Sequence, residues 1–299
     1  MSTREPASPD TSAGGTVAFL AQAMLLAAGR GERMRPLSDS MPKPLLAVHG
    51  KPLLWYPLRS LAAAGVRSAV INTGWLGDQL EPAFGSQLFF PPTPGHTGGD
   101  PSGKLLALRY SHEGRGAGEA LETAGGIVRA LPLLADVFWV AAGDVFVPDF
   151  AFSMTDLERF TASPHWAHIW LVPNPAHNPR GDFGLSADGL AVNPPKEDAT
   201  AKPAFDSTAT SHACASGPGA FAAFQVPGRL YTFSTIALYK RAFFEADWCD
   251  IPAGNPHGVK APLAAMLRAA MDQGLVSASL YEGLWVDVGT PERLAQLNT

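Results

Sequence analysis

Strand-length runs that are apolar throughout constrain the fold of this 299-residue chain more than any other feature. Such runs occur at 23–29, 68–74, 104–111, 136–144 and 168–174. Strands that are apolar at every position, rather than at alternate positions, are typical of sheets covered on both faces. Because helical patterns at 51–65 and 122–134 lie between these runs, the sequence predicts an α/β fold with a doubly wound sheet.

The second half of the chain continues the same domain with a different pattern. It reads as a hairpin at 183–192 around Asp188 and Gly189, a long strand at 229–240 and a helix at 260–274. The last segment predicts a strand, a tight turn at Gly289 and a helix that Thr290 caps and Pro291 begins. We therefore expect a single domain over 23–299.

Three polar segments are expected to lie outside that core. Residues 1–22 are predicted to form a flexible tail, since their first part is rich in Pro, Ser and Gly. Stretches at about 91–103 and 193–219 are rich in Gly, Pro, Ser and Thr and are interpreted as surface insertions.

Composition excludes several classes of protein. With 22 Lys and Arg against 27 Asp and Glu, the net charge is −5, so no basic stripe for nucleic acid or a membrane surface is expected. The chain has two cysteines, Cys214 and Cys249, without a CxxC pair, which excludes a disulfide scaffold and fits a reducing compartment. No apolar stretch approaches the roughly 20 residues of a membrane span. These features favour a cytoplasmic protein.

The sharpest motif, LAAGRGERMRPLSDSMPKPLL, directly follows the first apolar run. Gly29 and Gly31 allow a tight turn and a close approach to an anion, while Arg33, Arg35 and Lys43 supply positive charge within the same loop. This combination suits a triphosphate.

More common catalytic motifs do not fit. A dinucleotide fingerprint would need glycine where Met34 stands, and the P-loop spacing at 98–104 is followed by Leu105 instead of a hydroxyl residue. The serines lack a GxSxG elbow, and the eight histidines show no paired metal spacing.

Two aspartates follow apolar runs far apart in the chain. Asp144 ends VAAGD and Asp287 lies in LWVDVGT. Two carboxylates from distant segments can hold one Mg²⁺, which otherwise takes phosphate oxygens and water. The alternative is that each aspartate caps the turn that follows it.

Two further short segments are candidates for substrate contact. Residues 118–126 are rich in small side chains at the start of a helix, where backbone can approach a flat base, or they form an ordinary loop. In the segment 180–183, Asp182 could accept hydrogen bonds from sugar hydroxyls, although an exposed turn is the default for so short a cluster.

Taken together, these motifs resemble the sugar-1-phosphate nucleotidyltransferases. The similarity is specific in the glycine-rich motif and extends through nearly all of the chain from Ala23 except the two insertions. It includes the segments INTGWLGDQL, EALETAGGIVRALPLL, GDVFVPDF, RGDFGL, LYTFS, KAPLAAMLRAAM and LWVDVGTPERL. Within the family, the chain is most similar to the subfamily that uridylylates N-acetylmuramic acid 1-phosphate in peptidoglycan recycling.

The resemblance implies a Rossmann-like mixed sheet and a set of site residues. Arg33 and Lys43 would act in catalysis, Asp182 would contact the sugar, and Asp144 with Asp287 would hold Mg²⁺ as cofactor. The residues implied in binding UTP are Ala28, Gly29, Gly31, Glu32, Arg33, Lys43, Gly118 and Gly125. The partners would be UTP and a sugar 1-phosphate, with the protein a monomer or weak oligomer.

This chain also departs from the family pattern. The family usually has asparagine where Ala142 stands and glycine where Thr235 stands, and both positions would face the sugar. A lost amide removes a hydrogen bond worth about 1 kcal/mol and can change selectivity. A transferase for another hexose 1-phosphate therefore stays open, as does a non-catalytic paralogue that binds nucleotide sugars.

Overall fold

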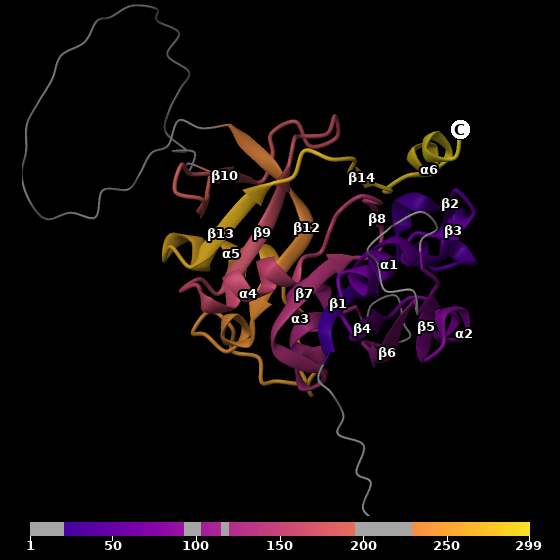
Figure 1. The fold of residues 1–299 in the computed structure, drawn as a ribbon, viewed down its shortest axis with the longest axis horizontal. Coiled ribbons are helices and arrows are strands. Elements are labelled where there is room, and N and C mark those ends of the chain that lie inside the picture. Colours follow the sequence, from indigo (N-terminus) through magenta and orange to yellow (C-terminus); the bar gives the residue numbers. More distant parts are fainter. Residues whose placement is uncertain (1–20, 93–102, 115–119, 195–228) are drawn as a thin grey trace, which may run out of the picture.

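The uniformly apolar runs form the centre of the sheet in the computed structural model, which describes residues 21–92, 103–114, 120–194 and 229–299 (Figure 1). The strands here are β1 (Ala21–Ala27), β4 (Ser68–Thr73), β6 (Lys104–His112) and β7 (Leu134–Ala142). They are parallel in the order β7-β1-β4-β6, and β5 (Gln87–Phe90) lies antiparallel at the outer edge.

A long strand, β12 (Leu230–Lys240), extends the sheet on the other side. It is antiparallel to β7, to β9 (Ala167–Val172) and to β10 (Phe183–Leu185). β13 (Val276–Leu280) runs parallel to β9, and β11 (Ala191–Val192) pairs with β10 as the predicted hairpin. The sheet is therefore mixed, which confirms the expected fold class.

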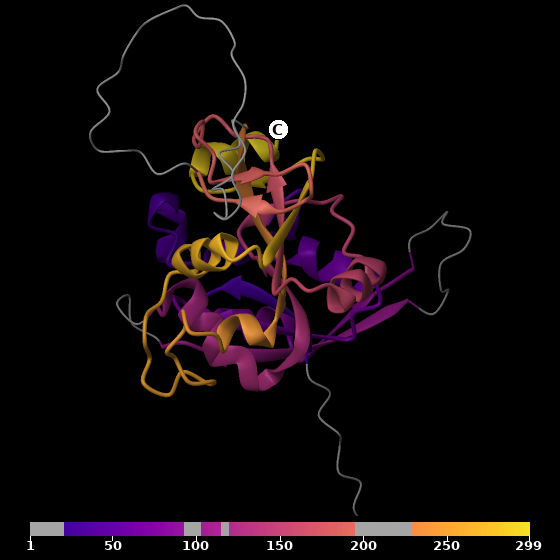
Figure 2. The same ribbon diagram turned by 90° about the vertical axis from the view of Figure 1, so that its left-hand side faces the viewer.

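Helices cover both faces of this sheet (Figure 2). On one face, α1 (Trp55–Ala63), α2 (Leu80–Phe84) and α4 (Met154–Ala162) pack in the cluster that contains Ala23 and Leu25 of β1. On the other, α3 (Glu122–Ala130) and α5 (Leu263–Asp272) pack in the cluster that contains Met24. Neighbouring residues of one strand thus enter opposite cores, which is why these strands are apolar at every position.

A third, smaller apolar cluster joins the two ends of the described chain. It includes Met34, Val48, Phe146 and Val288. The elements here are β2 (Ala47–Val48), β3 (Lys51–Pro52), β8 (Val145–Phe146), β14 (Val286–Asp287) and α6 (Pro291–Leu297). Since β8 pairs with β14, residues 144 and 287 are brought to the same place.

Helices are present where the sequence predicted them, but their first and last residues differ from the prediction. The pattern at 122–134 forms a helix only to Ala130 and then a 3-10 turn containing Pro132, which has no N–H to continue the α-helix. The pattern at 51–65 begins with β3, and its helix starts at Trp55. Thr290 caps α6 as predicted, its hydroxyl accepting from the Arg293 N–H.

Two helices escaped the sequence analysis, α4 and the five-residue α2. α4 buries only Phe160, so its apolar stripe is weak, although Ser153 caps its first turn. Most of the predicted tail and of the two insertions lies outside the described residues, so these assignments stay predictions; β1 already begins at Ala21. No helix among the described residues has the length and apolarity needed to cross a membrane.

Candidate active site

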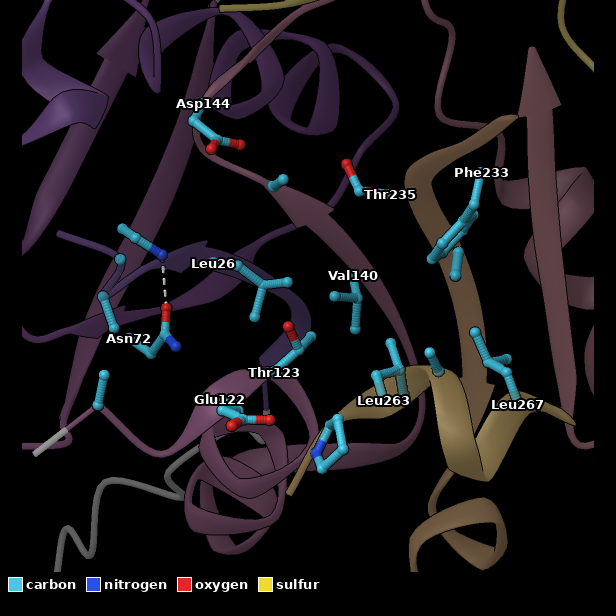
Figure 3. A pocket seen from close by; sticks show the side chains of 18 of the residues that line it. Leu26, Asn72, Glu122, Thr123, Val140, Asp144, Phe233, Thr235, Leu263 and Leu267 are labelled. Atoms are coloured by element: carbon cyan, nitrogen blue, oxygen red, sulfur yellow. Dashed lines mark hydrogen bonds between the residues drawn. The ribbon is translucent and has the colours of Figure 1, made fainter. Parts of the chain in front are cut away.

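A cavity of about 680 Å³ opens at the carboxyl ends of β1, β4, β6 and β7, where ligands bind in sheets of this kind (Figure 3). It has two ends. The α3 end is lined by Asn72, Glu113, Ala120, Glu122 and Thr123. The α5 end is lined by Asp182, Phe183, Phe233, Thr235, Ala237, Tyr239, Leu263, Ala264, Leu267 and Arg268.

The glycine-rich loop forms one wall between these ends. Gly31 has φ 64° and ψ 46°, a left-handed conformation that favours glycine. Its carbonyl accepts hydrogen bonds from the Met34 N–H, at 2.9 Å, and from the Ser38 hydroxyl, at 2.8 Å. Because Met34 is fully buried in the third cluster, the loop is anchored from beneath.

Lys43 projects from this loop to the two aspartates that the sequence singled out. Its ammonium lies 2.6 Å from the Asp144 carboxylate and 3.8 Å from that of Asp287. The Lys43 side chain is only 8% exposed, so this ion pairing is largely shielded from water. Lys43 therefore lies between Asp144 and Asp287, which form one acidic pair.

Two more basic groups touch Asp287. The Arg293 guanidinium lies 3.0 Å and the His177 ring 3.4 Å from the Asp287 Oδ2 atom. Burial lowers the pKa of His177, and the nearby Arg293 charge lowers it further, against the opposing effect of Asp287. His177 is thus favoured as a neutral ring at physiological pH.

The acidic pair fits a hard divalent cation that takes most of its ligands from elsewhere. Carboxylate oxygens are the preferred ligands of Mg²⁺, which keeps water and phosphate oxygens in its remaining positions. Within the described ranges, no group of three or more His, Cys, Asp or Glu side chains is arranged to hold a metal by itself. A cation here would therefore take its remaining ligands from water or phosphate oxygens.

At the α3 end, the polar groups are held by one another. The Asn72 amide oxygen accepts from the Ala27 N–H at 2.6 Å, and its NH₂ group donates to Glu113 at 2.5 Å. The second Glu113 oxygen accepts from the Leu121 N–H at 2.9 Å. Burial raises the pKa of Glu113, and these hydrogen bonds oppose that shift. Gly126 leaves the room for this carboxylate, since a Cβ there would lie 2.1 Å from its Oε1 atom.

At the α5 end, the polar groups are less completely matched. Asp182 accepts from the Phe233 N–H at 2.8 Å and from the Asn178 amide at 3.1 Å. The Tyr239 hydroxyl is buried without a hydrogen-bond partner among the described residues. Thr235 has φ 65°, an unfavourable value for a β-branched residue, at an irregularity in β12.

The structure brings most of the candidate residues to the cavity. Ala28, Gly29, Gly31, Lys43, Asp144 and Asp182 line it, and Asp287 reaches Lys43. Glu32 and Arg33 are exposed and do not line it. Gly118 lies outside the described residues, whereas Gly125 packs in α3 against Val259 and Ala261.

Several residues that line the cavity or contact Asp287 were missed by sequence reasoning. Asn72 lies at the end of β4 and Glu113 directly follows β6, so the carboxyl-end rule applied to every strand would have found both. His177, Tyr239 and Arg268 carried no such signal, because each reaches the site through tertiary packing.

Comparison with known proteins agrees with this geometry. Residues 22–188 match the sequence profile described as nucleotidyl transferase. The chain is 39% identical over 277 residues to N-acetylmuramate α-1-phosphate uridylyltransferase of Neisseria meningitidis serogroup B, covering 92% of this chain and 96% of that protein. It is 34% identical over 278 residues to the protein of the same name from Caulobacter vibrioides, covering 90% and 92%.

A solved structure is similar in fold. The crystal structure of a glucose-1-phosphate thymidylyltransferase from Bacillus anthracis, in complex with a sucrose, matches with a TM-score of 0.63 at 18% identity. The match covers 93% of both chains.

Proposed function

We propose that this chain, which belongs to the nucleotidyl transferase family, transfers UMP from UTP to N-acetylmuramic acid 1-phosphate and releases pyrophosphate. The observation that carries the proposal is Lys43 held between Asp144 and Asp287, in the middle of a cavity with two ends. A lysine beside a pair of carboxylates that can hold a divalent cation, placed between two compartments, suits a reaction that joins two phosphorylated substrates.

The α3 end is assigned to the nucleotide. It adjoins the loop with Gly29 and Gly31, whose backbone suits a triphosphate. Glu113 lies in the wall of this end, and a carboxylate can accept a hydrogen bond from the N3–H of uracil, which cytosine lacks. This chemistry supports UTP over CTP.

The α5 end is assigned to the sugar phosphate. Asp182 retains lone pairs for sugar hydroxyls beyond the two hydrogen bonds that it accepts from protein groups. The aromatic and aliphatic side chains around it provide apolar walls for the ring and its substituents.

The reaction needs positioning and charge neutralisation more than acid–base chemistry. An oxygen of the sugar phosphate attacks the α-phosphorus of UTP in line, the new P–O bond forms, and the bond to the β-phosphate oxygen breaks. The nucleophile is already an anion, so no general base is required. Lys43 lowers the repulsion between the two anionic substrates, and the exposed Arg33 supplies further positive charge to the departing pyrophosphate.

Enzymes of this family generally use a divalent metal. We assign that role to Mg²⁺ held by Asp144 and Asp287, where it would supply additional positive charge to the phosphates.

The direct test is pyrophosphate release in the presence of Mg²⁺. UTP, dTTP, GTP, ATP and CTP are each combined with the 1-phosphates of N-acetylmuramic acid, N-acetylglucosamine, glucose and mannose. The expected maximum is UTP with N-acetylmuramic acid 1-phosphate. A maximum with another hexose 1-phosphate would keep the reaction and replace the sugar, whereas no turnover would favour a non-catalytic binding protein.

A further inference from the structure

The α5 end contains a cation whose charge is not matched by a nearby carboxylate. The cavity-lining residues at 263, 264, 267 and 268 lie on one face of α5, as their helical spacing requires. Within the described part of the chain, Lys43 and Arg268 are the basic residues that line the cavity. Lys43 is paired with the two aspartates, whereas Arg268 has no carboxylate at ion-pair distance among the described residues.

Arg268 is held in place by contacts that leave most of its donors free. Its guanidinium lies over the Phe183 ring, 5.2 Å from the ring centroid. One Nη atom makes a long hydrogen bond, 3.4 Å, to the Asn193 side-chain oxygen. Asp272, one turn further along α5, accepts a hydrogen bond from Asn193 instead. A guanidinium has five N–H donors in a planar fork, so the geometry suits a carboxylate bound through two hydrogen bonds.

Arg268 itself is exposed, but the cavity wall next to it is apolar. This wall includes Phe183, Phe233, Leu263 and Leu267, and a less polar surrounding on that side strengthens the attraction between opposite charges. The one carboxylate of this end, Asp182, is turned to the Phe233 N–H and Asn178. A second negative charge on the sugar would therefore find a cation at this end of the cavity.

We propose that Arg268 binds a carboxylate carried by the sugar substrate and so selects acidic over neutral sugar 1-phosphates. This inference rests on the proposed function, because it assigns the α5 end to the sugar. N-Acetylmuramic acid differs from N-acetylglucosamine by a lactyl ether that carries a carboxylate. Arg268 is thus a specificity-determining residue that acts on this substituent and not on the phosphates.

The test compares the two sugars in one variant. Arg268→Gln keeps a side chain of similar polarity and removes the charge. We expect kcat/KM for N-acetylmuramic acid 1-phosphate to fall about 10- to 100-fold, the range expected for lost charge-assisted hydrogen bonds. The value for N-acetylglucosamine 1-phosphate and the KM for UTP should stay within about twofold, since neither substrate places a carboxylate at Arg268.

Two further variants make the result decisive. Arg268→Lys keeps the charge and loses the fork, and it should retain part of the preference for the acidic sugar. Arg229→Gln is the matched control: Arg229 also lies over an aromatic ring, that of Tyr231, but does not line the cavity. It should leave both sugars unaffected.

The outcomes separate this inference from the function on which it rests. If the wild-type protein uses N-acetylmuramic acid 1-phosphate and Arg268→Gln leaves that rate unchanged, or lowers both sugars equally, the role of Arg268 is wrong and the proposed function stands. If the wild-type protein turns over neither sugar with UTP, the proposed function itself fails, and the role of Arg268 fails with it.

Discussion

The two ends of the cavity differ in how far their polar groups are hydrogen-bonded within the protein. At the α3 end, Asn72 and Glu113 are locked by hydrogen bonds to each other and to the backbone N–H groups of Ala27 and Leu121. At the α5 end, Tyr239 has a buried hydroxyl without a partner among the described residues, and Arg268 lacks a carboxylate there. At the α3 end both carboxylate oxygens of Glu113 already have a protein partner, whereas at the α5 end the Arg268 guanidinium keeps most of its donors for a ligand.

This difference indicates where selectivity can change at least cost to stability. A buried polar group that is already paired costs stability when its partner is removed. A polar group that has no protein partner and faces the cavity can be replaced with little effect on the free energy of unfolding. We therefore expect substitutions at the α3 end to lower the stability of the fold. Substitutions of ligand-facing groups at the α5 end should change the sugar preference with little loss of stability.

The largest effect is expected where the two ends meet. Asp144→Asn removes one charge of the acidic pair at nearly constant shape, so turnover should fall by about a thousandfold or more while the chain still folds. Pyrophosphate release measures the loss, and thermal denaturation checks the fold. Asp149→Asn, which changes an exposed aspartate nearby, is the matched control and should be active. Activity close to wild type in Asp144→Asn would remove this residue from the proposed metal site.

The next effect tests the locked α3 end. Glu113→Gln replaces one of two accepting oxygens by an NH₂ group, so either Asn72 or the Leu121 N–H loses its partner. We expect the free energy of unfolding to fall by about 1–3 kcal/mol, as measured by urea denaturation. Glu122→Gln, a change at the same end, should be nearly neutral and serves as the control. Equal stability of the two variants would contradict the idea that hydrogen bonding preorganises this end.

The smallest effect has the opposite sign and belongs to the α5 end. Thr235→Gly should raise the free energy of unfolding by up to about 1 kcal/mol, because relief at φ 65° exceeds the entropy lost by glycine. Thr235→Ala keeps a Cβ in the same backbone conformation and should not show this gain. Denaturant titration of both variants distinguishes backbone strain from the loss of the hydroxyl. A destabilised Thr235→Gly would show that the threonine side chain contributes packing that outweighs its strain.

Much of the fold was predictable because the burial of a strand determines which of its positions are apolar. Strands such as β1 and β7 are covered on both faces and are therefore apolar at every position. The capped α6 was readable from Thr290 and Pro291. The helix α4 was not, because it rests on the sheet mainly through Phe160 and shows no continuous apolar stripe.

Site residues were predictable where they lie close together in the sequence or follow a recognisable apolar segment. Gly31 and Lys43 lie in one loop, and Asp144 and Asp287 each follow a recognisable apolar segment. Arg268 was not predictable, because it is an exposed arginine on an amphipathic helix and only the tertiary structure shows that it lines the cavity.

The pairing of β8 with β14 has a consequence for a chain that is still being synthesised. The loop with Gly31 and Lys43 leaves the ribosome early, but Asp144 acquires its neighbouring strand only after Asp287 has been added. Since a domain generally folds as a unit, the candidate site cannot be complete in a nascent chain that does not yet contain Asp287. The proposed activity would then arise only after β14 has been synthesised and has paired with β8.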